Sequence, residues 1–317
     1  MSKEKDITEK ALEACPDVFA DIVNGLLFDG REVIKEKELE DAISHTQLKI
    51  KGEIHEQERD VAKYWKNGEI RIALCGLENQ SVPDQDMPLR VISYDGAEYK
   101  NQVNLHISER RGHRPISPTY PALTLVLYFG DKPWNKPRSL MECFGDIPCE
   151  IAPFVQDYKI HVFEIAFMTP EQVMRFSSDF KIAIDLILQE KLTGKYVPSN
   201  QAIRHVDEFL GFLSAVKADK RYEELKEVFI QQEKEETTMC DIINSFTEKG
   251  RVEGLEKGRV EGRAEGRAEG RAEGQRQMMG IIQKMKEGKS DEDIYQAYPD
   301  ASRELVQMLR SGFPYPS

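Results

Sequence analysis

The stretch EQERDVAKYWKNGEIRIALCGLENQSVPDQDMPLRVISYDGAEY, residues 56–99, determines the expected fold of the chain. A short β-rich segment (Val61 to Trp65) and a longer strand (Glu69 to Leu77) flank a turn-like Lys-Asn-Gly sequence. Two antiparallel strands of similar length place the start of one beside the end of the other. The sequence therefore predicts a β-hairpin in which Asp60 and Glu78 are neighbours.

The end of this hairpin has the composition of a site for a hard cation. Gln80 is two residues after Glu78, so alternation along an extended chain points both side chains to one face. Magnesium prefers one or two carboxylates, with water, carbonyl and phosphate oxygens in its other positions. Asp60 and Glu78 supply such a pair, and the backbone carbonyl of Asn79 is a candidate third ligand. Composition alone fits two solvated acidic residues at strand ends equally well.

The flanking sequence predicts an α/β fold with a mixed sheet flanked by helices. Apolar residues recur at helical spacing between residues 8 and 45, and the pattern stops near an Asp-Gly break. Residues 46–165 contain β-rich runs, of which ALTLVLYFG and IHVFEIAF suggest strands covered on both faces. Between them, Pro88 to Gln102 has helical spacing, with these candidate inward positions: Leu89, Ile92, Tyr99 and Val103.

The expected organisation has four parts. Residues 1–165 form the α/β core, and residues 166–240 form a helical segment packed on it. Residues 241–277 carry a repeated Gly-Arg-x-Glu unit, and residues 278–317 form a C-terminal helical segment. On an ideal helix each four-residue unit advances by about 400°, so the glycines trace a slowly rotating stripe. The repeat fits a self-association or spacer helix, or a charged linker without such a role.

Composition limits the classes of function. The chain has 317 residues, 40% of them hydrophobic, and a formal net charge of -12, so any contact with DNA must be local. The five cysteines are scattered, which favours reduced thiols over a disulfide framework or zinc site. The apolar runs are shorter than the roughly 18 residues of a membrane span, and the first residues lack the apolar core of a signal peptide. We expect a cytoplasmic protein that does not enter membranes.

Several motifs resemble one known family. They are ENQS followed by PDQDMPLRVISY, the hairpin that Asp60 opens, CPDVFADIVNGLLFDGREVI, TLVLYFGDKPWNKPRSL and the charged glycine repeat. Together, over roughly residues 15–275, they resemble the Rpn family of recombination-promoting nucleases, also described as YhgA-like putative transposases, within the PD-(D/E)XK nuclease superfamily. The resemblance implies a PD-(D/E)XK nuclease-like core.

The family's acidic motif corresponds to Asp60, and its Glu-x-Gln motif to Glu78 and Gln80. In the wider superfamily a lysine often follows two positions after the glutamate, where it positions water or stabilises charge on phosphate. Gln80 orients water but carries no positive charge, so Arg90 of the MPLR segment or Lys63 are candidates to supply it.

The resemblance also implies an acidic residue on the first helix. Asp21, in the apolar setting FADIVN, is the preferred candidate, and Asp17 lies one turn earlier on the same face. The Asp17 carboxylate also fits a helix N-terminal charge favoured by the dipole. Arg110 and Arg111 belong to the densest basic cluster and are candidate phosphate contacts, or else part of a solvated loop.

The resulting expectation is a Mg²⁺-dependent DNA endonuclease of low sequence specificity, because no recognition helix or zinc finger is evident. The resemblance links it to DNA recombination, to mobile elements or to defence against foreign DNA. The alternative is a nuclease-fold protein of little or no activity that binds DNA or oligomerises. A homodimer or higher oligomer through the C-terminal repeat is compatible with both.

Overall fold

The computed structural model describes residues 10–42, 45–50, 53–58, 60–231 and 236–312. Contacts between residues divide the chain into two compact units, Met1–Ile243 and Asn244–Ser317. The site predicted from the hairpin belongs to the first unit. All five cysteines have free thiols. Within the described ranges, no helix combines the length and apolar character needed to cross a membrane.

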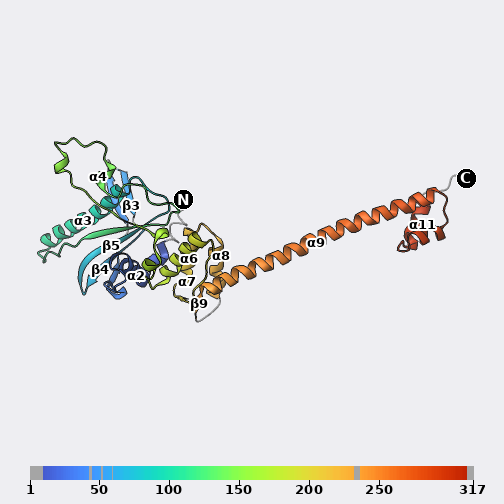
Figure 1. The fold of residues 1–317 in the computed structure, drawn as a ribbon, viewed down its shortest axis with the longest axis horizontal. Coiled ribbons are helices and arrows are strands. Elements are labelled where there is room, and N and C mark those ends of the chain that lie inside the picture. The colour runs from blue at the N-terminus through green and yellow to red at the C-terminus, as the bar shows by residue number, and fades with distance from the viewer. Residues whose placement is uncertain (1–9, 43–44, 51–52, 59, 232–235, 313–317) are drawn as a thin grey trace. The chain divides into compact units, whose positions relative to one another are not determined.

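The first unit contains a five-stranded mixed sheet in the order β1-β4-β5-β6-β7 (Figure 1). The strand β4 pairs antiparallel with both β1 and β5, whereas β6 pairs parallel with both β5 and β7. The bounds are Leu39–Asp41 for β1, Val61–Asn67 for β4, Ile70–Gln80 for β5, Ala122–Tyr128 for β6 and His161–Glu164 for β7. A separate hairpin consists of β2 (His45–Ile50) and β3 (Glu53–Glu58). The predicted α/β class with a mixed sheet is confirmed.

The strands β4 and β5 form the predicted hairpin. Gly68 occupies the turn with a φ of +61°, a left-handed conformation that glycine adopts readily. Val61 pairs with Leu77, and a register shift follows Trp65. The second strand is longer than the sequence indicated, because it continues through Glu78 to Gln80 along its parallel partner β6.

Helices cover both faces of the sheet (Figure 1). Residues 10–14 form a helical turn that precedes α2 (Pro16–Leu27), and α3 (Met87–Arg111) connects β5 to β6. The other long helices of this unit are α6 (Asp179–Thr193), α7 (Val206–Val216) and α8 (Arg221–Gln231). The short elements are η1 (Glu36–Glu38), α4 (Leu140–Cys143), η2 (Ala152–Phe154), η3 (Ile165–Phe167), α5 (Pro170–Val173), β8 (Ala202–Ile203) and β9 (Thr237–Thr238).

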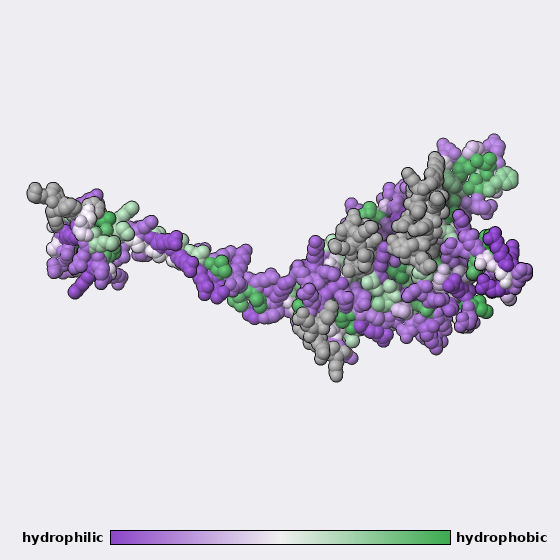
Figure 2. Space-filling model, turned by 180° about the vertical axis from the view of Figure 1, so that it is seen from behind, coloured by the Kyte–Doolittle hydropathy of each residue, from purple (hydrophilic) through white to green (hydrophobic). Residues whose placement is uncertain are grey.

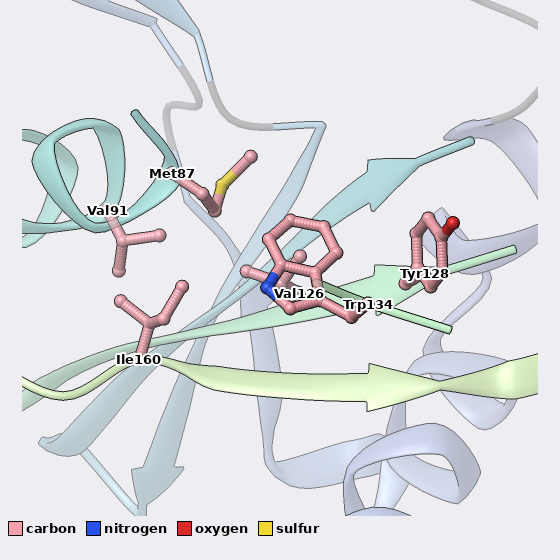
Figure 3. Packing of buried hydrophobic residues seen from close by; sticks show 6 residues of the cluster. All are labelled: Met87, Val91, Val126, Tyr128, Trp134 and Ile160. Atoms are coloured by element: carbon pink, nitrogen blue, oxygen red, sulfur yellow. The ribbon is translucent and has the colours of Figure 1, made fainter. Parts of the chain in front are cut away.

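The first turn of α3 is held by a hydrophobic cluster. Met87 and Val91 on the helix pack with Val126 of β6 and with Trp134 and Ile160, as Figure 3 shows. Met87 is 0% exposed and Val91 is 1% exposed. Burial of side chains of this size contributes roughly 1.5–3 kcal/mol each, so the cluster fixes the start of α3 on the sheet.

Three of the four predicted inward positions of α3 were wrong. Leu89, Tyr99 and Val103 are 44%, 40% and 53% exposed, whereas Ile92 is half-buried. The helix instead turns polar side chains inward, because neighbouring hydroxyl and backbone groups need partners there. Glu98 accepts a hydrogen bond from Tyr120 Oη at 2.7 Å, and further inward positions are Asp95 and Gln102, which bond to Thr124 and to the backbone of Tyr120.

The run IHVFEIAF is a strand only in its first half. β7 ends at Glu164, and residues 165–167 form the 3₁₀ helix η3.

Beyond the sheet, an aromatic cluster joins the helices to the end of β6. Phe129 lies 5.6 Å from Phe212, and Phe180 lies 6.1 Å from Phe212, between ring centroids. This cluster packs the helical segment on the sheet.

The second unit begins within α9 (Met239–Lys286), which has 48 residues. Every residue from 247 to 276 is exposed, and Figure 2 shows this helix as mainly hydrophilic. The end of α9 packs against α10 (Asp291–Ala297) and α11 (Arg303–Gly312) around a small core. That core consists of Ile281, Met285, Ile294, Ala301 and Val306. The Gly-Arg-x-Glu repeat is therefore helical throughout.

Candidate active site

The structure brings Asp60 and Glu78 together at the end of the hairpin. Val61 pairs with Leu77, so the same register places Asp60 opposite Glu78. The Asn79 N–H donates to Asp60 Oδ2 at 2.6 Å. Asp60 directly precedes β4, and its carboxylate accepts this bond as a backbone carbonyl of a paired strand would. The hydrogen bond holds the Asp60 carboxylate beside the end of β5.

Glu78 is buried and its carboxylate is paired. It is 1% exposed, and its Oε1 accepts from Arg90 Nη2 and, at 3.3 Å, from Gln80 Nε2. Burial works against the charge on the Arg90 guanidinium, but the Glu78 carboxylate raises the pKa of Arg90 above its ordinary value. Alternation places Glu78 and Gln80 on the α3 face of the sheet, as predicted for a shared face.

Arg90 also joins the strand to the loop that follows it. Its Nη1 donates to Asp84 Oδ2 at 2.9 Å, and its Nη2 lies 3.2 Å from Tyr94 Oη. Burial and then the Glu78 carboxylate raise the pKa of Tyr94. Its phenol is therefore neutral near pH 7, as an ordinary tyrosine would be. The Arg90 side chain is 39% exposed. Arg90 thus lies between the buried Glu78 carboxylate and solvent.

The helical turn at residues 10–14 contacts the same strand end, which the sequence did not indicate. Lys10 Nζ lies 3.2 Å from Asp60 Oδ1. One turn later, Glu13 is 0% exposed and its Oε2 accepts from Asn79 Nδ2 at 2.7 Å. Among the described residues, the buried Asn79 Oδ1 has no hydrogen-bond partner. Two side chains of one turn therefore fix the N-terminal helix on the motif.

Lys63 is not brought to this site. It lies opposite Cys75, an odd number of positions from Glu78, and so on the other face of the sheet. Its ammonium is paired with Asp41 and lies 5.9 Å from the centre of the Phe19 ring. Lys63 is 2% exposed. The prediction that it supplies charge to a phosphate is wrong for this arrangement, because strand alternation turns it into the core.

Asp21 is also away from the hairpin end, which corrects its predicted role as the helix acid of the site. Its two oxygens accept from the N–H and hydroxyl groups of Ser177 and Ser178 at 2.7 to 3.1 Å. Asp17 is bound by Arg204 and His205 at 3.0 and 2.9 Å. Asp21 thus holds α2 to the start of α6, where Ser178 is the N-cap residue, and Asp17 holds it to the start of α7, where His205 is the N-cap residue.

Asp21→Ala is expected to reduce stability without affecting the hairpin end. Loss of these charge-assisted hydrogen bonds should lower the free energy of unfolding by about 2 kcal/mol, measured by urea denaturation. Asp207→Ala is the matched control, because the Asp207 side chain is 52% exposed and its ion pair with Lys226 is worth about 1 kcal/mol or less. Equal stability of Asp21→Ala and wild type would contradict the bracing role.

Arg110 and Arg111 lie at the far end of α3. Both are exposed, in the last turn of the helix. At about 1.5 Å rise per residue, Arg110 is about 30 Å along the helix axis from Arg90. They are therefore not part of the Glu78 site. A DNA duplex of this length would reach from the Glu78 site to both arginines.

The oxygen atoms at the hairpin end fit a hard cation. The N–H and C=O of one strand residue point to the same side, so the Asn79 carbonyl points toward Asp60 as its N–H does. The next carbonyl, of Gln80, points the other way and accepts from Phe129 N–H at 2.8 Å. In the described part of the chain, no group of three or more His, Cys, Asp or Glu side chains has the arrangement of a metal site. Two carboxylates and a carbonyl suit a cation that keeps water ligands, such as Mg²⁺.

One known protein family matches the region that contains this site. Residues 66–223 match the model of the family described as "Putative transposase, YhgA-like". The chain belongs to this family. No curated protein and no solved structure matches the chain. In this YhgA-like putative transposase the matched region includes Glu78, Gln80 and Arg90, whereas Lys10 and Asp60 precede it.

Proposed function

We propose that this YhgA-like protein is a Mg²⁺-dependent DNA endonuclease of low sequence specificity. The observation that supports this most strongly is the meeting of Asp60 and Glu78 at the end of one hairpin, beside two basic side chains. Membership of a family of putative transposases supports DNA as the substrate. The cellular role that we propose is in DNA recombination, in the movement of mobile elements or in defence against foreign DNA.

Asp60, Glu78 and the carbonyl of Asn79 would hold the cation. When bound, Mg²⁺ supplies charge that orients water and stabilises negative charge on the scissile phosphate. In hydrolysis, the oxygen of a water molecule bonds to phosphorus and gives up a proton to solvent, the bond from phosphorus to the leaving oxygen breaks, and that oxygen takes a proton from solvent. Gln80 contributes a neutral amide that orients water through hydrogen bonds, but it supplies no charge.

The pairs at the site favour a second candidate. Asp60 and Glu78 already contact the ammonium of Lys10 and the guanidinium of Arg90, so a metal ion competes with built-in cations. This competition supports a protein of little or no nuclease activity that binds DNA. Such a protein would oligomerise through the exposed repeat helix. Light scattering of the full chain tests the oligomer, because a monomer mass would reject it.

Asp60→Ala decides between an enzyme and a binding module. Wild-type protein is expected to relax and linearise supercoiled plasmid in Mg²⁺, and Asp60→Ala to do so at least about 100-fold more slowly, since one charged ligand is lost. Asp17→Ala is the control: Asp17 is similarly buried, at 18% exposure against 14% for Asp60, and also ion-paired, but lies away from the hairpin end. Absence of cleavage by wild type, or equal cleavage by wild type and Asp60→Ala, would reject the enzyme.

A further inference from the structure

The end of β5 that carries Glu78 and Gln80 lacks a basic side chain of its own, because Arg71 lies near the other end of the strand, beside the hairpin turn. Gln80 is neutral, and the β4 lysine nearer to this end, Lys63, is buried on the opposite face. Cleavage of a phosphodiester places additional negative charge on the phosphate, and a fixed positive group close by stabilises that charge. A nuclease built on this strand therefore needs a cation from another element.

Arg90 is not well placed to be that group. Its guanidinium contacts Glu78, Asp84 and the hydroxyl of Tyr94. These contacts use both terminal nitrogens and hold the group against the buried carboxylate. Arg90 is therefore a positioning residue for Glu78.

Lys10 is held at the other carboxylate. Its Nζ is 3.2 Å from Asp60 Oδ1, and the side chain is 16% exposed. Glu13 lies on the same helical face one turn later, and its Oε2 accepts a hydrogen bond from Asn79 Nδ2 at 2.7 Å. This bond fixes the position of the N-terminal helical turn relative to β5. An ammonium has three donors, so one such group bonds to a carboxylate and to a phosphate oxygen at the same time.

We propose that Lys10, positioned by Asp60, supplies the positive charge that Gln80 lacks and contacts the phosphate that is cleaved. The inference rests on the proposed nuclease function. It assigns a role to the N-terminal helical turn, which lies outside the region matched by the family. The ammonium moves no proton in this role; it binds the phosphate and stabilises its charge in the transition state.

The experiment compares Lys10→Met, Lys10→Arg and a matched control in the full chain. The control is Lys226→Met, because Lys226 is 14% exposed and ion-paired with Asp207, away from the hairpin end. Plasmid cleavage in Mg²⁺ is expected to fall about 100-fold in Lys10→Met. Lys10→Arg retains the charge and should stay within about tenfold of wild type, and Lys226→Met should cleave like wild type.

A second readout does not depend on cleavage. Affinity for a labelled 30-base-pair duplex is measured in Ca²⁺ over a series of salt concentrations. Lys10→Met should reduce the slope of log affinity against log salt by about one, because one phosphate contact is lost, whereas Lys10→Arg and Lys226→Met should keep the slope. The urea midpoint of each variant shows whether it is folded.

The outcomes separate the two proposals. If wild type does not cleave plasmid, the nuclease proposal fails, and the salt slope alone then tests the phosphate contact of Lys10. Lys10→Met with the slope and cleavage rate of wild type would overturn the inference while leaving the nuclease in place. A lower urea midpoint with an unchanged slope would also overturn it, because Lys10 would then only stabilise the fold. Wild type that neither binds nor cleaves DNA would reject both.

Discussion

Glu78→Gln is expected to reduce the rate of plasmid cleavage in Mg²⁺ about 1,000-fold, which corresponds to about 4 kcal/mol of transition-state stabilisation. The substitution keeps the size of the side chain and replaces one oxygen by an NH₂ group, so the charge for a cation is lost. Glu78 is the one acidic residue of β5 and is 1% exposed, so no other carboxylate of the strand replaces it. Single-turnover rates measured over a range of Mg²⁺ concentrations check the prediction.

Glu98→Gln is the matched control for this experiment. Glu98 is also buried, at 6% exposure, and lies on α3, where it accepts from Tyr120 Oη at 2.7 Å. The same chemical change there should leave the cleavage rate within about threefold, because Glu98 touches neither the hairpin end nor Arg90. Full activity of Glu78→Gln, or an equal loss in both variants, would remove Glu78 from the proposed chemistry.

Arg90→Met is expected to lower the free energy of unfolding by about 3 kcal/mol. Removal of one partner from a buried ion pair leaves an uncompensated charge, which typically costs about 3–5 kcal/mol. The lower end applies because the Arg90 side chain is 39% exposed, although that of Glu78 is 2% exposed. Urea denaturation at pH 7 measures the difference from wild type.

A double-mutant cycle tests whether this loss comes from the ion pair. In the background of Glu78→Gln the buried charge is absent, so the further change Arg90→Met should cost about 1 kcal/mol or less. An equal cost in both backgrounds would mean that Arg90 stabilises the fold through Asp84 and Tyr94 instead. The cycle needs no nuclease activity and is informative for either candidate function.

The hairpin was predictable because its signals are local. A turn sequence with glycine at a left-handed position and two β-rich segments specify the pairing of β4 with β5, and that pairing places Asp60 beside Glu78. The continuation of β5 to Gln80 was missed because it depends on β6, a strand far along the chain. Tertiary pairing thus extended an element whose existence local sequence had already indicated.

The buried face of α3 was not predictable from apolar spacing. The periodicity method assumes that apolar side chains face the core, but this helix buries Asp95 and Glu98 against hydroxyl groups. Once those polar positions take the inward face, Val103 and its apolar neighbours turn toward solvent. The choice between the two faces depends on Thr124 and Tyr120, which are remote in sequence.

The helix contribution to the site was assigned to the wrong residue. The apolar setting of Asp21 suggested a buried acid, but that carboxylate is used by Ser177 and Ser178, which no pattern near it predicts. Glu13 and Lys10 belong to a strongly polar stretch that gave no strand or motif signal. Their spacing of one helical turn was the available signal, but the partner strand needed to interpret it lies beyond residue 60.

The position of β5 in the sheet has a consequence for motion. It is the third strand in the order β1-β4-β5-β6-β7, with a hydrogen-bonded neighbour on each side. Central strands open only in the rarest fluctuations of a domain, so the amide hydrogens of β5 should exchange among the slowest in the chain. Glu78 and Gln80 therefore stay in place when a large polymer approaches. When the protein adjusts to the polymer, the parts that move are the loop with Asp84 and the N-terminal turn with Lys10, which surround Glu78 and Gln80.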